Sequence, residues 1–156
     1  MNPLDWIVRF CEVCARPLLR FFGSPQMEIQ SGWLGWSDRD RQQFVLLLWV
    51  KFINAKEKPF LLRSLEVEHR GVKYKAIAKL GDVSILGSTG WRVRTLLPKN
   101  CAVGSPQIPA IDVADRHGYF SLPKHLADNA GGFQFEVSAT FHGGRSRTGK
   151  FTVDTI

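Results

Sequence analysis

The alternation of apolar and polar residues predicts a chain of β-strands arranged around one continuous apolar run. This run, residues 44–53, reads FVLLLWVKFI and includes a single charged residue, Lys51. A helix of this length is too short to cross a bilayer, which takes about 20 residues. β-Branched and aromatic side chains dominate the run and favour a strand. Because both faces of this strand are apolar, other parts of the chain must cover both.

Further strands are predicted on either side of this run. The clearest are residues 72–80 and 133–141, in which every second residue is apolar. Glycine, proline and short polar segments separate the strands, as expected for turns between antiparallel neighbours. We also expect one helical turn at residues 123–127, and a loop at 98–109 that crosses between two sheets. The prediction is about seven or eight short strands. The clear ones are residues 44–53, 60–69, 72–80, 91–97, 119–122, 133–141 and 147–155, and the weaker ones are 26–36 and 83–86.

Residues 4–22, LDWIVRFCEVCARPLLRFF, follow a helical period instead. Their charged side chains fall within a sector of about 80° on a helix, and the rest of the circumference is apolar. Pro17 is expected to kink this helix, and Gly23 to end it. Three locations would bury its apolar face: a membrane interface, the uncovered face of the strand at 44–53, or a partner or second copy. For contact with a membrane or a partner, the expected residues are Trp6, Phe10, Leu18, Leu19, Phe21 and Phe22. Packing on the protein's own sheet or in an oligomer is favoured, because enrichment in Trp and Arg does not by itself define a membrane helix.

The predicted strands resemble those of immunoglobulin and fibronectin type domains. A strand ending at Asn54, a charged turn, Pro59 and a further strand are similar to the second and third strands of such domains. The closing glycine hairpin at 142–145 is similar to the turn between their last two strands. The resemblance covers residues 26–156 and implies an antiparallel immunoglobulin-like β-sandwich, preceded by the amphipathic helix at residues 1–23. The Cys…Trp…Cys signature of antibody domains is absent from the sequence, so the resemblance concerns the fold alone.

Composition and charge narrow the function classes. The 156 residues fit one domain with an appendage, and the net charge of +7 favours contact with an anionic surface or partner. We expect no signal peptide, because charges interrupt the apolar N-terminus, and no transmembrane run. The expected location is the cytoplasm, with peripheral membrane association left open.

Three cysteines, Cys11, Cys14 and Cys101, argue against a disulfide framework. Cys11 and Cys14 lack a second pair, so they predict small apolar positions on a helix and no metal or cofactor.

Basic side chains provide one candidate binding surface. They are expected on outward faces of the strands and around the last hairpin, where together they would bind an anion. The alternative, slightly favoured, is that they prevent edge strands from pairing with other chains. The candidate anion-binding residues are Lys73, Lys75, Lys79, Arg92, Arg94, Arg145, Arg147 and Lys150.

Aromatic side chains provide a second candidate surface, a platform for carbohydrate. It would consist of Trp33, Trp36, Trp91 and Tyr119, and it requires at least two coplanar exposed rings. Coverage of the core by these rings is favoured. Nucleic-acid binding is less favoured than protein or membrane contact, because only Trp91 stands among the charges for base stacking.

Catalytic chemistry has little support in the sequence. Asp112, Asp115 and His117 lie close together and could serve a metal or an acid–base reaction. A third partner at a defined spacing is missing, so their placement on a loop is favoured. We therefore expect no catalytic residues. The predicted function is a non-catalytic interaction module, positioned by its N-terminal helix at a membrane surface or protein partner, with carbohydrate or nucleic-acid binding as alternatives.

Overall fold

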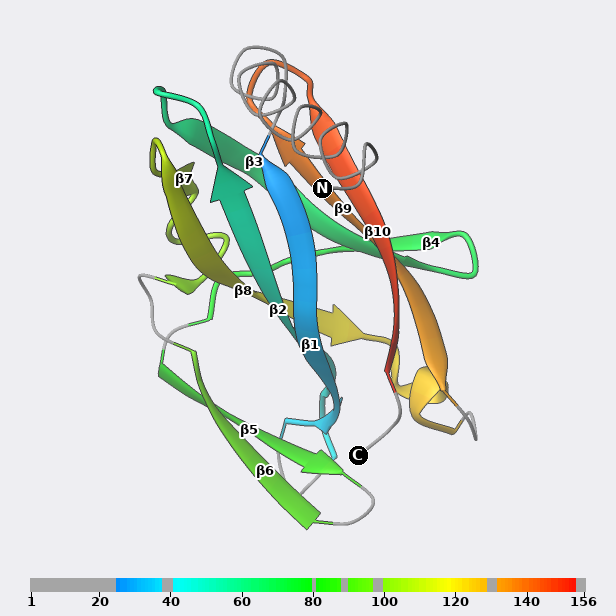
Figure 1. Ribbon diagram of the computed structural model, residues 1–156. Helices are drawn as coiled ribbons and strands as arrows, with labels where there is room; N and C mark the ends of the chain where they lie inside the picture. The colour runs from blue at the N-terminus through cyan, green and yellow to red at the C-terminus, as the bar shows by residue number, and fades with distance from the viewer. Residues whose placement is uncertain are drawn as a thin grey trace, which may run out of the picture.

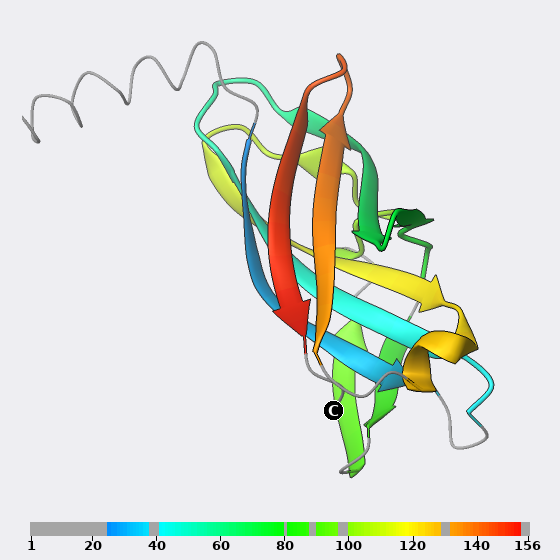
Figure 2. The same ribbon diagram turned by 90° about the vertical axis from the view of Figure 1, so that its right-hand side faces the viewer.

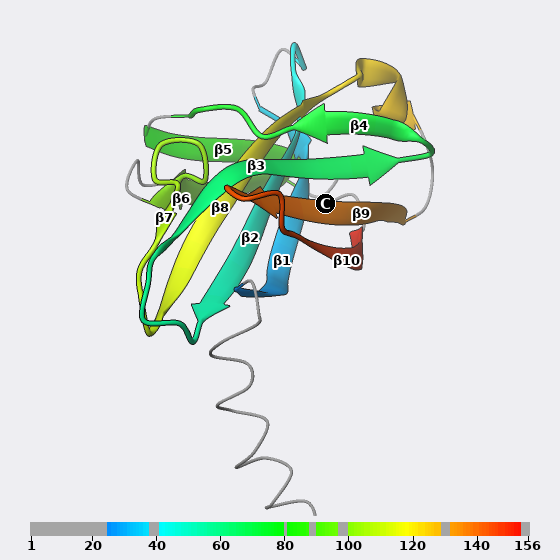
Figure 3. The same cartoon turned by 90° about the horizontal axis from the view of Figure 1, so that it is seen from above.

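The computed structural model describes residues 25–37, 41–79, 81–87, 90–96, 100–128 and 132–153. These residues form a mostly β structure of two antiparallel sheets (Figure 1). The first sheet has the strand order β6-β5-β1-β2-β8, and the second has the order β10-β9-β3-β4, with β7 also paired to β3. The strands of the two sheets cross when viewed from above (Figure 3). The elements are β1 (Gln26–Trp36), β2 (Phe44–Asn54), β3 (Phe60–His69), β4 (Val72–Lys75), β5 (Gly81–Gly87), β6 (Gly90–Leu96), β7 (Gln107–Ile108), β8 (Asp112–Leu122), the 3-10 helix η2 (Lys124–Asp128), β9 (Phe133–Phe141) and β10 (Ser146–Val153).

The apolar run predicted as the central strand is β2, which lies between β1 and β8 along its whole length. Every second side chain of β2 points toward the second sheet, where it meets alternate residues of β3 and β9. We call this region the main core. The alternation predicted for residues 133–141 is confirmed, because the inward residues of this strand, β9, are all buried. The β2 members of the main core are Phe44, Leu46, Leu48, Val50 and Phe52, each at most 2% exposed.

The opposite face of β2 is buried as well, and the described residues provide part of its cover. Val45 and Leu47 are 0% exposed on this face, and we call their surroundings the second core. We expected the segment at residues 4–22 to cover them. Within the described chain the cover comes from the β5 strand and the segment around Cys101. The other members of the second core are Val83, Ile85, Cys101 and Tyr119, with Trp33 packed against them.

Close packing of β5 on β1 depends on Gly35. A methyl group at Gly35 would lie 2.6 Å from the Ile85 Cγ2 atom and 2.6 Å from the carbonyl oxygen of Leu86. Leu86 pairs with Trp36, the last residue of β1. Only a residue without a side chain lets β5 approach β1 at this point.

The largest departures from the predicted strands concern β8, β4 and β7. β8 has 11 residues, from Asp112 to Leu122, where a short strand at 119–122 was expected. β4 ends at Lys75, not Leu80, because the chain then crosses to the first sheet, where Ile77 pairs with Tyr119. β7 lies inside the loop expected at 98–109. The described chain therefore contains ten strands, more than the seven or eight predicted.

The helix predicted at residues 4–22, and with it the proposed boundary after residue 23, lies outside the described residues. The single helical turn expected at 123–127 is present as η2. None of the helical segments in the described ranges has the length and apolar character needed to cross a membrane.

Candidate functional site

Three turns meet at one end of the molecule, and we call this region the loop end. They are the β2–β3 turn at residues 55–59, the β7–β8 turn at 109–111, and the β9–β10 hairpin at 142–145. Figure 2 shows all three at the upper end of the body, where β1 also begins. The arrangement follows from strand direction, because β2 and β9 end here and β3, β8 and β10 start here.

The buried side chain of Asn54 holds two of these turns together. Its Nδ2 donates hydrogen bonds of 2.9 Å to the carbonyl oxygens of Lys58 and Pro109. Its Oδ1 accepts a bond of 2.9 Å from the Lys56 amide. The side chain is only 2% exposed, so these bonds are shielded from water. A further backbone bond joins the Ile111 amide to the Lys56 carbonyl at 2.9 Å, which makes the two turns one unit.

Ile111 occupies an unusual position on this unit. Its φ is 49°, in the left-handed region, which is unfavourable for a β-branched residue by about 1–2 kcal/mol. Its side chain is nevertheless 62% exposed, so packing does not offset the strain. Two more exposed apolar residues lie at this end, Val113 at 50% in β8 and Leu61 at 45% in β3. Strain maintained by the surrounding structure, and not offset by burial, is a feature of functional surfaces.

Cations lie on the other two turns of the loop end. Lys56 lies with its Nζ 5.3 Å from the centroid of the Phe60 ring. Loss of solvation lowers the pKa of the Lys56 amine, and the positive charge of Arg145 lowers it further. In the part of the chain that is described, Lys56, Lys58 and Arg145 form no ion pair with a carboxylate. Among the residues that the structure describes, these three cations of the loop end are therefore not paired with a carboxylate.

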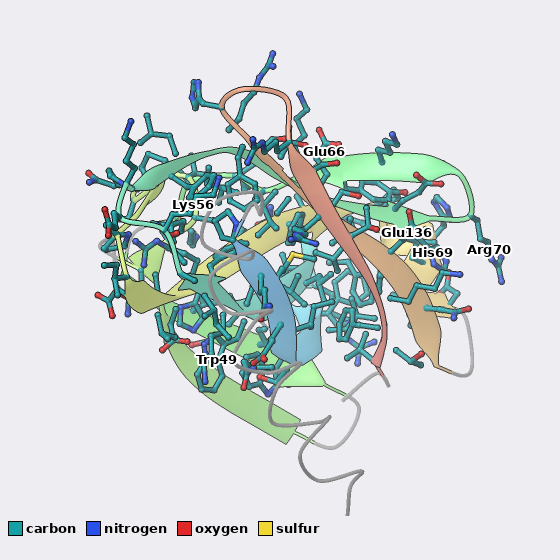
Figure 4. The ribbon with its side chains drawn as sticks, turned by 45° about the horizontal axis from the view of Figure 1, so that its top comes forward. Trp49, Lys56, Glu66, His69, Arg70 and Glu136 are labelled. Carbon is teal, nitrogen blue, oxygen red and sulfur yellow. The ribbon has the colours of Figure 1, made fainter. Side chains whose placement is uncertain are left out.

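The other predicted basic residues lie elsewhere. Lys150 is opposite Glu136, Glu136 is opposite Glu68, and Glu68 is opposite Lys73, in one row across β10, β9, β3 and β4. In the next row the Lys75 Nζ lies 3.8 Å from the Glu66 Oε1. Figure 4 labels Glu66 and Glu136 on this sheet. The outer face of the second sheet is thus balanced in charge and does not form a continuous basic patch.

Lys79, Arg92, Arg94 and Arg147 complete the predicted set. Lys79 lies on the first sheet, with its Nζ 5.5 Å from the Tyr119 ring centroid, away from Lys73 and Lys75. Arg92 and Arg94 pair with β5 through their backbone, and their side chains lie outside the described part. Arg147 Nε donates a 3.2 Å bond to the carbonyl oxygen of Pro25, where β1 begins. Of the eight candidates, the structure therefore brings Arg145 and Arg147 to the loop end.

The predicted aromatic platform is not assembled by the residues that are described. Tyr119 is 1% exposed and belongs to the second core. Trp33 packs on the second core, whereas Trp36 packs on the main core, with its ring centroid 5.2 Å from that of Phe44. Trp33 and Trp36 therefore lie on opposite faces of β1 and cannot stack on one sugar. The side chain of Trp91 lies outside the described part.

Asp115 and His117 lie on the outer face of the first sheet beside Trp49, a residue that the sequence analysis did not select (Figure 4). The Trp49 Nε1 donates a 3.2 Å bond to the Asp115 Oδ1, and the indole stacks on His117 with centroids 6.1 Å apart. Burial lowers the pKa of the His117 imidazole, while the Asp115 carboxylate opposes this shift. Asp112 instead accepts a 2.7 Å bond from the Val113 amide at the loop end.

These contacts give Asp112 and Asp115 structural partners. Within the described ranges, no group of three or more His, Cys, Asp or Glu side chains gathers in a way that could hold a metal ion. The membrane or partner contacts predicted at Trp6, Phe10, Leu18, Leu19, Phe21 and Phe22 lie outside these ranges.

Comparison with known proteins identifies no family. No family model and no curated protein matches the chain. Among solved structures, ycdA of Bacillus subtilis, described as a lipoprotein, is 15% identical with a TM-score of 0.46. The match covers 83% of this chain and 36% of that one, so this chain spans about a third of its length. The ApaA protein of Bordetella pertussis is 12% identical with a TM-score of 0.37, over 83% of this chain and 93% of that one. Identities this low carry no information about function.

Proposed function

We propose that this chain is an immunoglobulin-like, non-catalytic interaction module that binds its partner through the loop end. The order of the strands supports the immunoglobulin-like assignment. β1, β2 and β8 have the positions of strands A, B and E of such domains, and β10, β9, β3 and β4 those of G, F, C and C′. The β5–β6 hairpin is an addition beside β1 that builds the second core.

The observation that carries the proposal is the position of Ile111. A strained apolar side chain is held in solvent by a backbone that a buried asparagine fixes in place. Binding residues are often found on loops that a rigid scaffold positions in this way. The cations Lys56, Lys58 and Arg145 lie on the other two turns of the loop end and would select a partner of negative charge.

Carbohydrate binding has weaker support, because Tyr119 is buried and Trp33 and Trp36 face opposite ways. Nucleic-acid binding would require exposed rings among the loop-end cations for base stacking. The ring beside Lys56 is that of Phe60, which is half-buried and packs edge-on against Phe141.

Site-specific photo-crosslinking in cells that produce the protein tests the proposed surface. A benzophenone side chain replaces Leu61, at the loop end, or Val72, at the far end of β3. The two residues are a matched pair, since both are exposed apolar side chains at 45% and 52%. We expect covalent adducts with the probe at position 61 and not with the probe at position 72. Equal labelling at both positions, or adducts only at position 72, would show that the loop end is not the binding surface.

A further inference from the structure

We propose that the loop end binds the surface of an anionic membrane, with Ile111 inserted among the lipid headgroups and Lys56, Lys58 and Arg145 against their phosphates. This inference rests on the proposed function and names the partner of the same surface. Its occupant is a lipid bilayer that carries negative charge, and not a soluble acidic protein.

The first argument is complementarity of charge. The three turns and the residues that flank them carry four cations, Lys56, Lys58, Arg145 and Arg147, against two acids, Glu57 and Asp112. One of the acids, Asp112, already accepts a bond from the Val113 amide. Clusters of Lys and Arg are attracted to anionic lipid surfaces, and the attraction falls off within a Debye length.

The second argument is the placement of the apolar side chains. Ile111, Val113 and Leu61 are each between 45% and 62% exposed at this end. Apolar side chains next to cations match the two layers of a bilayer surface, because the apolar groups enter the acyl boundary while the cations stay among the headgroups. These three apolar side chains form a small group at the end of the molecule, which suits insertion into a bilayer surface. A stable protein interface usually needs a broader contact area.

The third argument is where the remaining chain joins the body. Residues 1–24 connect to β1 at Pro25, whose carbonyl oxygen accepts the bond from Arg147. Within these residues, 4–22 carry the amphipathic pattern with Trp, Phe and Arg that is typical of an interfacial segment. The chain therefore enters the described body at the loop end, where β1 begins. Two weak membrane contacts joined in one chain strengthen each other, because the second contact becomes intramolecular.

The rigidity of the turns favours binding in a further way. Asn54 fixes the backbone of both turns before any ligand is present, so inserting Ile111 requires little additional ordering. Because the turn is held by Asn54, the side chain at position 111 can be changed without changing the backbone. Asparagine tolerates the left-handed conformation better than isoleucine, so Ile111→Asn removes the apolar side chain and keeps the turn.

Flotation of the full chain with vesicles tests the inference. The vesicles contain phosphatidylcholine alone, or phosphatidylcholine with phosphatidylserine. We expect binding only to the vesicles with phosphatidylserine, and weaker binding at high salt. Ile111→Asn should weaken the binding about tenfold, and the double variant Lys56→Gln/Lys58→Gln about thirtyfold. The matched controls, Val72→Asn and the double variant Lys73→Gln/Lys75→Gln at the far end of the second sheet, should bind like the wild type.

Hydrogen exchange of the wild type with and without vesicles gives an independent readout. We expect slower exchange at residues 55–59 and 142–145 when phosphatidylserine is present, and no change at the β3–β4 turn. If the loop-end variants bind vesicles as well as the wild type does, the inference is overturned and membrane contact belongs to residues 1–24. If no vesicles are bound but the probe at position 61 captures a protein, the proposed function stands and the membrane as its partner is rejected.

Discussion

The side-chain amide of Asn54 donates a 2.9 Å hydrogen bond to the carbonyl oxygen of Pro109, 55 residues further along the chain. Its second donor reaches Lys58, and its oxygen accepts from the Lys56 amide. The hydrogen bonds of this one side chain thus join the β2–β3 turn to the β7–β8 turn. The conformation of Ile111 depends on this link, because its amide bonds to Lys56.

Replacing Asn54 by alanine should loosen both turns. Asn54→Ala leaves two carbonyl oxygens and one amide without this partner, and we expect a loss of about 1–3 kcal/mol of unfolding free energy. Denaturant unfolding measures this loss, and hydrogen exchange at Lys56 measures the loosening. Gln134→Ala, at an exposed side chain on β9, is the control and should change neither. Unchanged exchange at Lys56 in Asn54→Ala would show that the turns hold their shape without the side chain.

Ile111→Asn should leave the fold intact or stabilise it by up to about 1 kcal/mol, because the strain of a β-branched residue at φ 49° is relieved. The measurement is the midpoint of thermal or denaturant unfolding. The comparison is Val113→Asn. Val113 does not have a positive φ, so this substitution should not raise the midpoint of unfolding. A clear loss of stability in Ile111→Asn alone would mean that the isoleucine packs on something that offsets its strain.

Gly35→Ala should destabilise the protein by about 1–3 kcal/mol, because the new methyl group would overlap a carbonyl oxygen that cannot move without displacing β5. Gly149→Ala is a matched strand glycine whose methyl group would meet only the ends of the Ile29 and Met27 side chains, at 3.3 and 3.6 Å. We expect Gly149→Ala to be close to neutral. Equal effects of the two substitutions on the unfolding midpoint would contradict the close approach of β5.

The lowered pKa of His117 predicts a stability that falls in acid. Above about pH 6.5 the imidazole is neutral in both the folded and the unfolded chain, so it adds no pH dependence. As the pH falls below this value, the unfolded chain takes up the proton first, and unfolding becomes easier until the folded imidazole is protonated too. The melting temperature of the wild type should therefore fall relative to that of His117→Gln between about pH 7 and pH 5.

His125→Gln, at an exposed residue of η2, controls for general effects of losing a histidine. It should follow the wild type across the same pH range. If His117→Gln also follows the wild type, burial beside Trp49 does not disfavour the charged imidazole.

The main core was predictable because its strands obey a strict period of two. The inward residues of β2 and β9 are the ones that alternation selects, and all are buried. β8 was predicted as a short strand because its first half is polar. Arg116 points toward the main-core side there, yet its guanidinium donates to the carbonyl oxygens of Ser105 and Gln107, which satisfies it within the strand's own surroundings. A polar residue that is satisfied by carbonyl oxygens of the preceding segment leaves no periodic signal in the sequence.

The candidate site was less predictable than the fold. Asn54 was recognised as the end of a strand, but its role depends on Pro109, whose proximity only the fold creates. The φ of Ile111 follows from the same contact and has no sequence signature, since isoleucine ordinarily avoids this conformation. The basic residues were selected by type, and only the strand register shows that Lys73 and Lys150 lie opposite glutamates while Arg145 does not.

β2 belongs to both cores at once, because its successive side chains enter the main core and the second core alternately. Its backbone also bonds to β1 on one side and to β8 on the other. The strand cannot leave one core while it stays in the other, so neither core can melt separately. We therefore expect a single cooperative unfolding transition for the described body, with the amides of β2 exchanging only when the whole body opens.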